Sequence, residues 1–298
     1  MKTVYSHSRL STFENCRRQF RYRYVDQIPV ATQGIEAFMG KLVHAIAEKL
    51  NLVTAAGQVP SLPAVLKRYE TLWEETFDPE TTRIVREGME PEHYRLTGAR
   101  CTENLYRGHY PFDDGESIGI EEKVNVDLDP EGRYRLRGVI DRVVRKPDGA
   151  IEIHDYKTGA RVPSQARIDE DRQLALYQLA IAERFPDAPI ELVWHYLARN
   201  QVRRSTRTPE QLQALREKTM ARIDGVEAET AYAPKTGPLC RWCEYNDRCE
   251  AGRDLLGITT PLPPDPPPRT QRARPAGGDD DQLSLFSGAG PRPELLGS

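Results

Sequence analysis

The clearest structural signal in this chain is the segment GVIDRVVRKPDGAIEIHDYKTG, residues 138–159. Its centre, KPDG, is typical of a tight turn, because Pro suits the first turning position and Gly149 suits the left-handed position that closes a three-residue loop. β-branched residues flank this turn in VIDRVV and AIEIHDY, and they favour strands. We therefore predict a β-hairpin whose loop is formed by Pro147, Asp148 and Gly149.

This loop determines which residues of the two strands face one another. If Lys146 pairs with Ala150, counting outward places Asp141 opposite Asp155. Directly opposed side chains have Cβ atoms about 5 Å apart, where like charges destabilise the pair. A bound divalent cation would reverse the sign of that interaction. A register slip of one residue would separate the two acids, and two solvated acids on an exposed face are the alternative.

The second strand of the hairpin is apolar near the turn and charged further out. Because side chains alternate between the two faces, one face carries Ile151, Ile153, Asp155 and Lys157. Two carboxylates can hold one or two Mg²⁺ or Mn²⁺ ions, and the backbone carbonyl of Tyr156 is a further candidate ligand. A lysine beside them can orient a water molecule or neutralise charge on a phosphate.

Composition restricts the classes of protein that this chain can belong to. With 298 residues, 38% hydrophobic and 29% charged, the chain is long enough for one large domain or two small ones. It has no apolar run of membrane-spanning length, and its start, MKTVYSHSRL, lacks a signal peptide. We expect a cytoplasmic protein with no membrane partner. Because the net charge is −3, nucleic-acid binding would depend on local patches such as residues 16–25 and 199–207, which can equally be solvated faces.

Hydrophobic periodicity predicts an α/β core with a helical insertion and no internal repeat. A serine, Ser8 or Ser11, is the expected cap of the first helix. The predicted helices are 8–25, 38–53, 63–77, 80–108, 169–185 and 208–224, and the predicted strands are 117–128, 133–146, 150–157 and 190–198.

The character of the chain changes after residue 257. Nine of the 41 residues from 258 to 298 are proline, accompanied by glycines and a run of three aspartates. This composition is typical of a disordered tail, so we predict an ordered domain over residues 1–257.

The hairpin resembles a known nuclease motif. Asp141, followed after thirteen residues by Asp155-Tyr156-Lys157, is similar to the PD-(D/E)XK motif in the GxIDR…DYKT form of RecB-type nuclease domains. Asp-x-Lys alone is common, so the order of the neighbouring motifs carries the resemblance. It implies a mixed central sheet flanked by helices and a metal-dependent nuclease activity.

Two further segments match the family in the same order along the chain. GKLVHAIAE resembles its GxxxH helix, which gives His44 a metal-ligand role and places Gly40 one turn away, where a missing side chain permits close approach. QLALY matches QxxxY, which places Gln173 and Tyr177 on one helix face beside the active site. Each match alone also fits an ordinary structural role.

The family has a further acidic position on the strand that precedes the hairpin. Glu121 in GIEEKV corresponds to it, and the neighbouring Glu122 is the alternative. The resemblance thus implies Asp141, Asp155, Lys157, Gln173 and Tyr177 as catalytic-site residues. It also implies Mg²⁺ or Mn²⁺ ligation by His44, Asp141, Asp155 and the Tyr156 carbonyl.

Four of the five cysteines form a second candidate metal site. Cys240, Cys243 and Cys249 have the spacing C-x₂-C-x₅-C, which allows several thiolates to reach one metal centre, and Cys16 is the candidate fourth ligand. The residue types alone do not separate zinc from iron–sulfur. Cys101 is left over, and we predict a buried thiol within a helix.

The cysteine pattern resembles the iron–sulfur subset of RecB-type nucleases, such as AddB and the CRISPR-associated members. In that subset one N-terminal and three C-terminal cysteines hold a [4Fe–4S] cluster that joins the ends of the chain. The resemblance implies such a lobe over about residues 5–30 and 235–255. One departure is Arg17, where members often have Pro after the first cysteine.

The tail contains an isolated apolar cluster in DDDQLSLFSG. It resembles the bacterial sliding-clamp-binding motif, in which two apolar residues fill a pocket and a glutamine hydrogen-bonds at its rim. The matching residues are Gln282, Leu283, Ser284, Leu285 and Phe286. A chance apolar spot is the alternative.

These observations together predict a DNA exonuclease that acts in repair or recombination. Phosphodiester hydrolysis by a metal-activated water, on DNA that is single-stranded, is the expected reaction. The alternatives are a non-catalytic DNA-binding subunit of a repair complex and a CRISPR spacer-processing nuclease.

Overall fold

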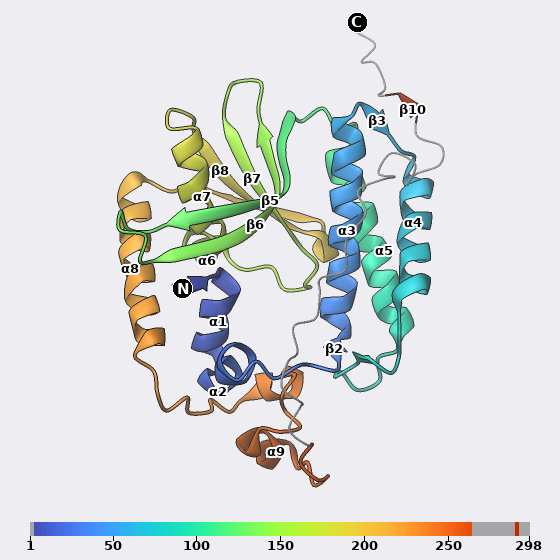
Figure 1. Cartoon of the computed structure of the whole chain (residues 1–298). Helices are drawn as coiled ribbons and strands as arrows, with labels where there is room; N and C mark the ends of the chain where they lie inside the picture. The colour runs from blue at the N-terminus through green and yellow to red at the C-terminus, as the bar shows by residue number, and fades with distance from the viewer. Residues whose placement is uncertain (1–2, 264–289, 292–298) are drawn as a thin grey trace, which may run out of the picture.

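A mixed six-stranded sheet forms the centre of the protein, with helices on both of its faces (Figure 1). The computed structural model describes residues 3–263 and 290–291. The sheet has the order β1-β6-β7-β8-β9, and β5 pairs with the long strand β6. Its strands are β1 (Val4–Tyr5), β5 (Glu116–Asp127), β6 (Arg135–Arg145), β7 (Ile151–Lys157), β8 (Ile190–Tyr196) and β9 (Gln201–Ser205).

Helices and short strand pairs account for the other regular elements. The helices are α1 (His7–Asn15), α2 (Arg17–Phe20), the π-helical turn η1 (Arg21–Val25), α3 (Ile35–Ala55), α4 (Leu62–Thr76), α5 (Pro91–His109), α6 (Gln165–Asp169), α7 (Gln173–Arg184), η2 (Leu197–Arg199), α8 (Pro209–Glu227), η3 (Pro238–Trp242) and α9 (Glu250–Leu256). The short strands form the pairs β2 (Gln33–Gly34) with β4 (Thr82–Arg83) and β3 (Gln58–Val59) with β10 (Gly290–Pro291).

The predicted hairpin is confirmed together with its register. The Lys146 amide donates to the Ala150 carbonyl at 2.8 Å, and Val143 pairs with Ile153 in the antiparallel β6–β7 ladder. Gly149 has a φ of 88°, the left-handed conformation that its place in the loop requires.

The sheet divides at the far end of this hairpin. The recorded pairing of β6 with β7 ends at Arg142 and His154, and further along, β6 pairs in parallel with β1 at Arg135 and Leu136. Asp141 and Asp155 are the next residues beyond the β6–β7 ladder, so both acids lie where the two strands separate.

Two hydrophobic cores hold the sheet between its helical layers. One core lies between the sheet and helices α1, α7 and α8, and includes Ile151 and Ile153 of β7. The other joins α3, α4 and α5 to the opposite face, where Tyr156 is buried. Helix α7 lies in the crossover between the parallel strands β7 and β8, which carries the chain back to the same end of the sheet.

The helical insertion 35–109 confirms the predicted α/β organisation, with local differences. The helix predicted over 80–108 begins at Pro91, because residues 82–83 pair with β2 instead. The first helix is capped by Ser6, whose hydroxyl accepts from the Arg9 amide at 3.1 Å, not by Ser8 or Ser11. The helix predicted over 169–185 begins later, at Gln173 of α7, and the separate short helix α6 ends at Asp169.

Strand β9 was not predicted, because its sequence QVRRS is polar and lies at the edge of the sheet. Helix α9 ends at Leu256, and Gly257, directly after it, has a φ of 64°. The boundary of the ordered domain at residue 257 stays a prediction. The clamp-like residues 282–286 lie outside the described residues.

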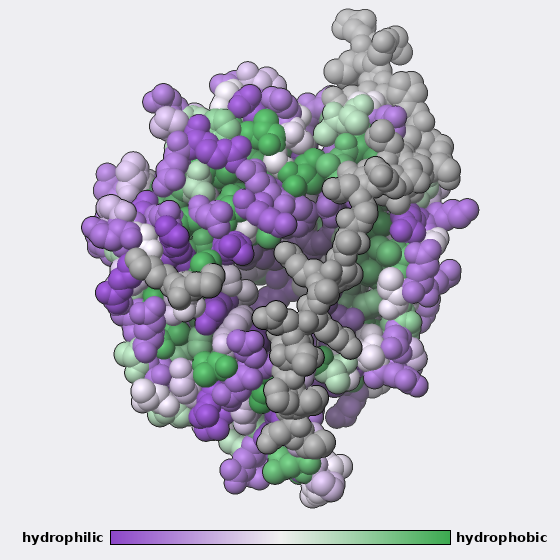
Figure 2. All heavy atoms as spheres, in the orientation of Figure 1, coloured by the Kyte–Doolittle hydropathy of each residue, from purple (hydrophilic) through white to green (hydrophobic). Residues whose placement is uncertain are grey.

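The surface is predominantly polar on the face that Figure 2 shows, where hydrophobic residues gather only in small separate groups. Within the described ranges, no helix combines the length and the apolar character that crossing a membrane requires.

Candidate active site and cysteine pocket

His44 of α3, Glu121 of β5 and Asp141 of β6 bring their ligand atoms together at the point where the sheet divides. One nitrogen or oxygen atom from each lies within 4.8 Å of the other two. His44 Nδ1 is 3.4 Å from Asp141 Oδ1. The two carboxylates supply the hard oxygen donors that Mg²⁺ and Mn²⁺ prefer, and the imidazole adds one softer nitrogen donor. We refer to these three residues as the His–Glu–Asp group.

The backbone at Glu121 has an unusual conformation that aims its side chain into this group. Its φ is 46°, in the left-handed region that side-chain-bearing residues seldom adopt. The ladder pairs Ile120 with Arg142 and Glu122 with Ile140, so Glu121 faces Asp141. Glu122 instead forms an ion pair with Arg184. The structure therefore favours Glu121 over Glu122 as the additional acidic residue.

Negative charge accumulates in the His–Glu–Asp group. Partial burial raises the pKa of Glu121 to about 7, and the neighbouring Asp141 carboxylate adds to the increase. Burial alone would lower the pKa of His44, but the contact with Asp141 and the charges of Asp155 and Glu121 outweigh it and raise that pKa. A site that favours protons in this way also favours a metal cation.

Asp155, Lys157 and Gln173 form a second group beside the first. Lys157 Nζ donates to Asp155 Oδ1 at 3.0 Å and to Gln173 Oε1 at 2.9 Å. Gln173 Nε2 in turn donates to Asp155 Oδ1 at 3.0 Å. Each member of this Asp–Lys–Gln group thus contacts the other two, and the predicted proximity of Gln173 to the motif is present in the structure.

Asp155 is the most deeply buried acid of the site, with 5% of its surface exposed. This burial raises its pKa, Lys157 opposes the rise, and the charge of Asp141 adds to it. Its Oδ2 lies 2.8 Å from Lys157 Nζ but has no well-directed hydrogen bond in the structure. Asp155 is not among the three residues that converge within 4.8 Å, so Lys157 is its main charged partner here.

A backbone contact joins the two groups. The Tyr156 amide donates to Asp141 Oδ2 at 2.6 Å, which holds the β6 carboxylate against β7. The Tyr156 side chain points to the other face of the sheet, where it is 1% exposed and its hydroxyl lies 3.4 Å from Asn51 Nδ2. Its backbone is therefore beside the site, while ligation through its carbonyl stays a prediction.

Two glycines of the matched motifs allow close packing around the site. A Cβ on Gly138 would lie 2.1 Å from Tyr177 Cε1, so the tyrosine ring packs directly on the β6 backbone. A Cβ on Gly40 would lie 3.2 Å from Thr158 Oγ1, so helix α3 approaches the end of β7 closely. Burial and the nearby Asp155 charge raise the pKa of Tyr177 to about 12, and this phenol stays protonated.

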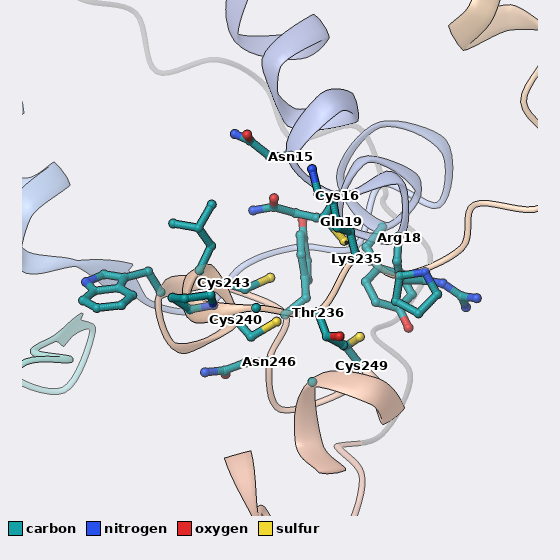
Figure 3. A pocket seen from close by; sticks show the side chains of 18 residues that line it. Asn15, Cys16, Arg18, Gln19, Lys235, Thr236, Cys240, Cys243, Asn246 and Cys249 are labelled. Atoms are coloured by element: carbon teal, nitrogen blue, oxygen red, sulfur yellow. Dashed lines mark hydrogen bonds between the residues drawn. The ribbon is translucent and has the colours of Figure 1, made fainter. Parts of the chain in front are cut away.

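The structure also brings together the four predicted cysteine ligands. Cys16, Cys240, Cys243 and Cys249 line one pocket of about 360 Å³, which we call the cysteine pocket. Figure 3 shows their sulfur atoms around a shared space, with Cys16 on the N-terminal helices and the other three on the C-terminal segment. Burial raises the pKa of Cys243 to about 12, and the neighbouring cysteines contribute to this. Cys101 is fully buried in α5, away from this pocket, as predicted.

Polar contacts hold the two ends of the chain together around the cysteine pocket. The Lys235 amide lies 3.5 Å from Cys16 Sγ. Glu244, next to Cys243, accepts from Gln19 at 2.7 Å and also pairs with Arg23. The contacts join segments more than 200 residues apart in the sequence.

Comparison with known families identifies this architecture. The family model described as the PD-(D/E)XK nuclease superfamily matches residues 4–250. The chain belongs to this superfamily. Its fold, an α/β architecture with a mixed central sheet flanked by helices, is the predicted one. Members of the superfamily are generally metal-dependent nucleases.

The comparison with curated proteins gives no match. Among solved structures, the crystal structure of SSO0001 is 15% identical, covers 82% of this chain and 95% of that chain, and has a TM-score of 0.32. A likeness of this degree carries no argument about activity.

Two residues that shape the site were not predicted from the sequence. Gly138 was within the quoted motif, and its absent side chain was the available signal. Arg172, directly before Gln173, contacts Glu14 at a separation of 158 residues, and no local pattern could reveal that contact.

Proposed function

We propose that this protein is a RecB-type nuclease that degrades single-stranded DNA from an end. The observation that carries the proposal is the position of the Asp–Lys–Gln group beside the His–Glu–Asp group where β6 and β7 separate. One group offers ligands for a cation, and the other offers a fixed positive charge next to it. Both can stabilise the negative charge that develops on the phosphate oxygens during phosphodiester hydrolysis.

The residues of the site have separate roles in this proposal. His44, Glu121 and Asp141 would hold Mg²⁺ or Mn²⁺, with Asp155 as a further oxygen donor. Such an ion stabilises charge on a phosphate and lowers the pKa of water. Lys157 neutralises charge on the phosphate oxygen, and Gln173 fixes the lysine by accepting from its Nζ at 2.9 Å. Tyr177 supports β6 through its packing on Gly138.

The cysteine pocket supports membership in the iron–sulfur subset. Among the described residues, no three of its cysteines bring their sulfurs within 4.8 Å of one another, since the His–Glu–Asp group is the one such cluster found. A zinc ion with Zn–S bonds of about 2.3 Å would need sulfurs about 3.8 Å apart. Wider-spaced thiols suit a [4Fe–4S] cluster better, and zinc is the alternative.

The preference for single-stranded DNA rests on the segment that follows Cys16. Arg18 and Tyr22 line the rim of the cysteine pocket, and the Arg18 guanidinium lies 6.0 Å from the Tyr22 ring centre. Arginine and aromatic side chains together bind the backbone and the bases of unpaired strands. Recruitment by the bacterial sliding clamp through residues 282–286 is proposed from the sequence motif alone.

Digestion of end-labelled DNA tests the activity. We expect anaerobically purified protein with Mg²⁺ or Mn²⁺ to shorten single-stranded DNA, and the position of the label to give the polarity. Asp155→Ala and Lys157→Ala should lower kcat at least about 100-fold. Asp187→Ala, a change at an exposed acid outside the site, serves as the matched control and should be neutral.

An inactive wild-type protein with a filled cysteine pocket would overturn the nuclease proposal. The fold would then serve as a non-catalytic DNA-binding subunit. Cleavage that survives both active-site variants would instead place the chemistry elsewhere in the molecule.

A further inference from the structure

Helix α1, which ends beside Cys16, is joined to the start of α7 by one arginine. Arg172 Nη1 donates to Glu14 Oε1 at 2.6 Å, and Arg172 Nη2 donates to the Ser11 hydroxyl at 3.1 Å. The Arg172 side chain is 15% exposed. A two-nitrogen contact of this kind fixes both distance and orientation, and partial burial strengthens it.

Arg172 directly precedes Gln173, the member of the Asp–Lys–Gln group with which helix α7 begins. It caps the helix, and its carbonyl accepts from the Leu176 amide at 2.9 Å. The next residue, Gln173, bonds to Asp155 and Lys157 through its side-chain amide. A displacement of the start of α7 therefore moves Gln173 away from the proposed catalytic lysine.

The other end of the contact lies beside the cysteine pocket. Glu14 lies two residues before Cys16, and Lys235 approaches both, with Nζ 3.5 Å from the Glu14 carbonyl and its amide 3.5 Å from Cys16 Sγ. The path runs along the chain from Cys16 to Glu14, crosses to Arg172 through the Glu14–Arg172 contact, and continues along the chain to Gln173. Helix α1 is thus held at the cysteine pocket and, through Arg172, at the active site.

We propose that Arg172 is a positioning residue through which helix α1, anchored at the cysteine pocket, holds Gln173 and therefore Lys157 in place. The inference rests on the proposed nuclease function and adds a residue and a coupling to it. Arg172 itself touches neither the His–Glu–Asp group nor Lys157 in any recorded hydrogen bond or ion pair of the described residues. Its effect should therefore fall on the rate of the chemical step and leave DNA binding intact.

Steady-state kinetics of Arg172→Gln on single-stranded DNA tests this. We expect kcat to fall about 10- to 100-fold, as displacement by about 1 Å can cause, and KM to change less than twofold. Arg172→Lys should restore part of the loss, because it keeps one charged contact with Glu14. Glu14→Gln should resemble Arg172→Gln, and the double variant should be no worse than either single one.

The chain provides a matched control on the same carboxylate. Arg222 Nε of α8 donates to Glu14 Oε1 at 2.9 Å, and within the described residues it forms no hydrogen bond or ion pair with α7. Arg222→Gln removes a similar ion pair from Glu14, so it should leave kcat within twofold. Equal losses from Arg172→Gln and Arg222→Gln would show a general effect on α1 and would overturn the proposal.

A second readout separates this inference from the nuclease proposal. Nuclear magnetic resonance of the Gln173 side-chain amide reports its bond to Asp155 whether or not DNA is cut. In Arg172→Gln the amide should exchange faster with solvent, while in Arg222→Gln it should match wild type. An active wild type with unchanged kcat and unchanged exchange in Arg172→Gln would refute the positioning role. A wild type that cuts no DNA would refute the nuclease function, and the amide exchange would still decide the role of Arg172.

Discussion

Glu121 faces Asp141 across strands β5 and β6 at the point where β6 separates from β7. Glu121 adopts a φ of 46°, and half-burial beside Asp141 raises its pKa to about 7. Both features lower the stability of the metal-free protein. The positive φ places the backbone in an unfavourable conformation, and the Glu121 carboxylate is repelled by that of Asp141. A residue kept under such strain is typical of a functional site, and a bound cation would relieve the charge component.

Replacing Glu121 by glycine should stabilise the metal-free protein while weakening metal binding. Glycine adopts a positive φ without steric cost, so relief of the backbone outweighs its extra entropy and the free energy of unfolding should rise by about 1 kcal/mol. Denaturation in EDTA measures this change, and Mn²⁺ titration measures the loss of affinity. Glu122→Gly is the control, since that residue has no recorded positive φ, and it should destabilise. Destabilisation by both changes would contradict the assignment.

Metal affinity should depend on pH through the same residue. The pKa of Glu121 is raised from 4.5 to about 7, so the group is protonated at pH 6 and ionised at pH 8. A carboxylate must lose its proton to bind a cation, and the raised pKa of His44 acts in the same direction. Mn²⁺ affinity measured by calorimetry should therefore rise from pH 6 to pH 8, by up to about tenfold per unit below the pKa for one released proton.

Linkage predicts the opposite trend for the stability of the metal-free protein. The folded-state pKa of Glu121 lies above its unfolded value. The stabilising contribution of Glu121 to the free energy of unfolding is therefore complete below about pH 4.5 and is lost as pH rises through about 7. In Glu121→Gln this part of the pH dependence should disappear from denaturation curves. An unchanged dependence would show that another group titrates there.

Gly138→Ala should destabilise the fold around the site. The new methyl group would lie 2.1 Å from Tyr177 Cε1, and the ring would have to leave the β6 backbone. Overpacking of this kind costs about 1–3 kcal/mol, measurable as a lower free energy of unfolding. Adding Tyr177→Leu should recover part of the loss, because it removes the clashing atoms. Gly225→Ala in α8, where nothing lies within 4 Å, should instead stabilise by up to about 1 kcal/mol.

The sequence revealed the parts of this structure that depend on local chemistry. The turn residues and β-branched strands of 138–159 predicted the hairpin and its register, because Gly149 and its neighbours permit few loops. The apolar stripe of residues 38–53 likewise predicted helix α3. The resemblance assigned the additional acidic position to Glu121 with Glu122 as the alternative, and the positive φ that distinguishes Glu121 in the structure could not be predicted from residue type.

Long-range polar contacts could not be predicted from the local sequence. Strand β9 forms because β8 offers it an edge, while its own residues resemble a charged loop. The Glu14–Arg172 contact joins two ordinary surface-type residues 158 positions apart. In contrast, the cysteine pocket was predicted, because cysteines at the spacing C-x₂-C-x₅-C are typical of a shared metal site.

The identity of the group in the cysteine pocket gives a last prediction. Anaerobically purified wild-type protein should contain about four iron atoms per chain and absorb visible light, as expected of a [4Fe–4S] cluster. Cys249→Ser removes one of the proposed cluster ligands and should lose both the iron and the absorbance. Because the group would join the N-terminal helices to residues 240–249, its loss should also lower the melting temperature. Cys101→Ser, in the core of α5 and outside the pocket, should keep the iron. A colourless protein with one zinc per chain would assign the pocket to zinc instead, and it would remove the main support for membership in the iron–sulfur subset.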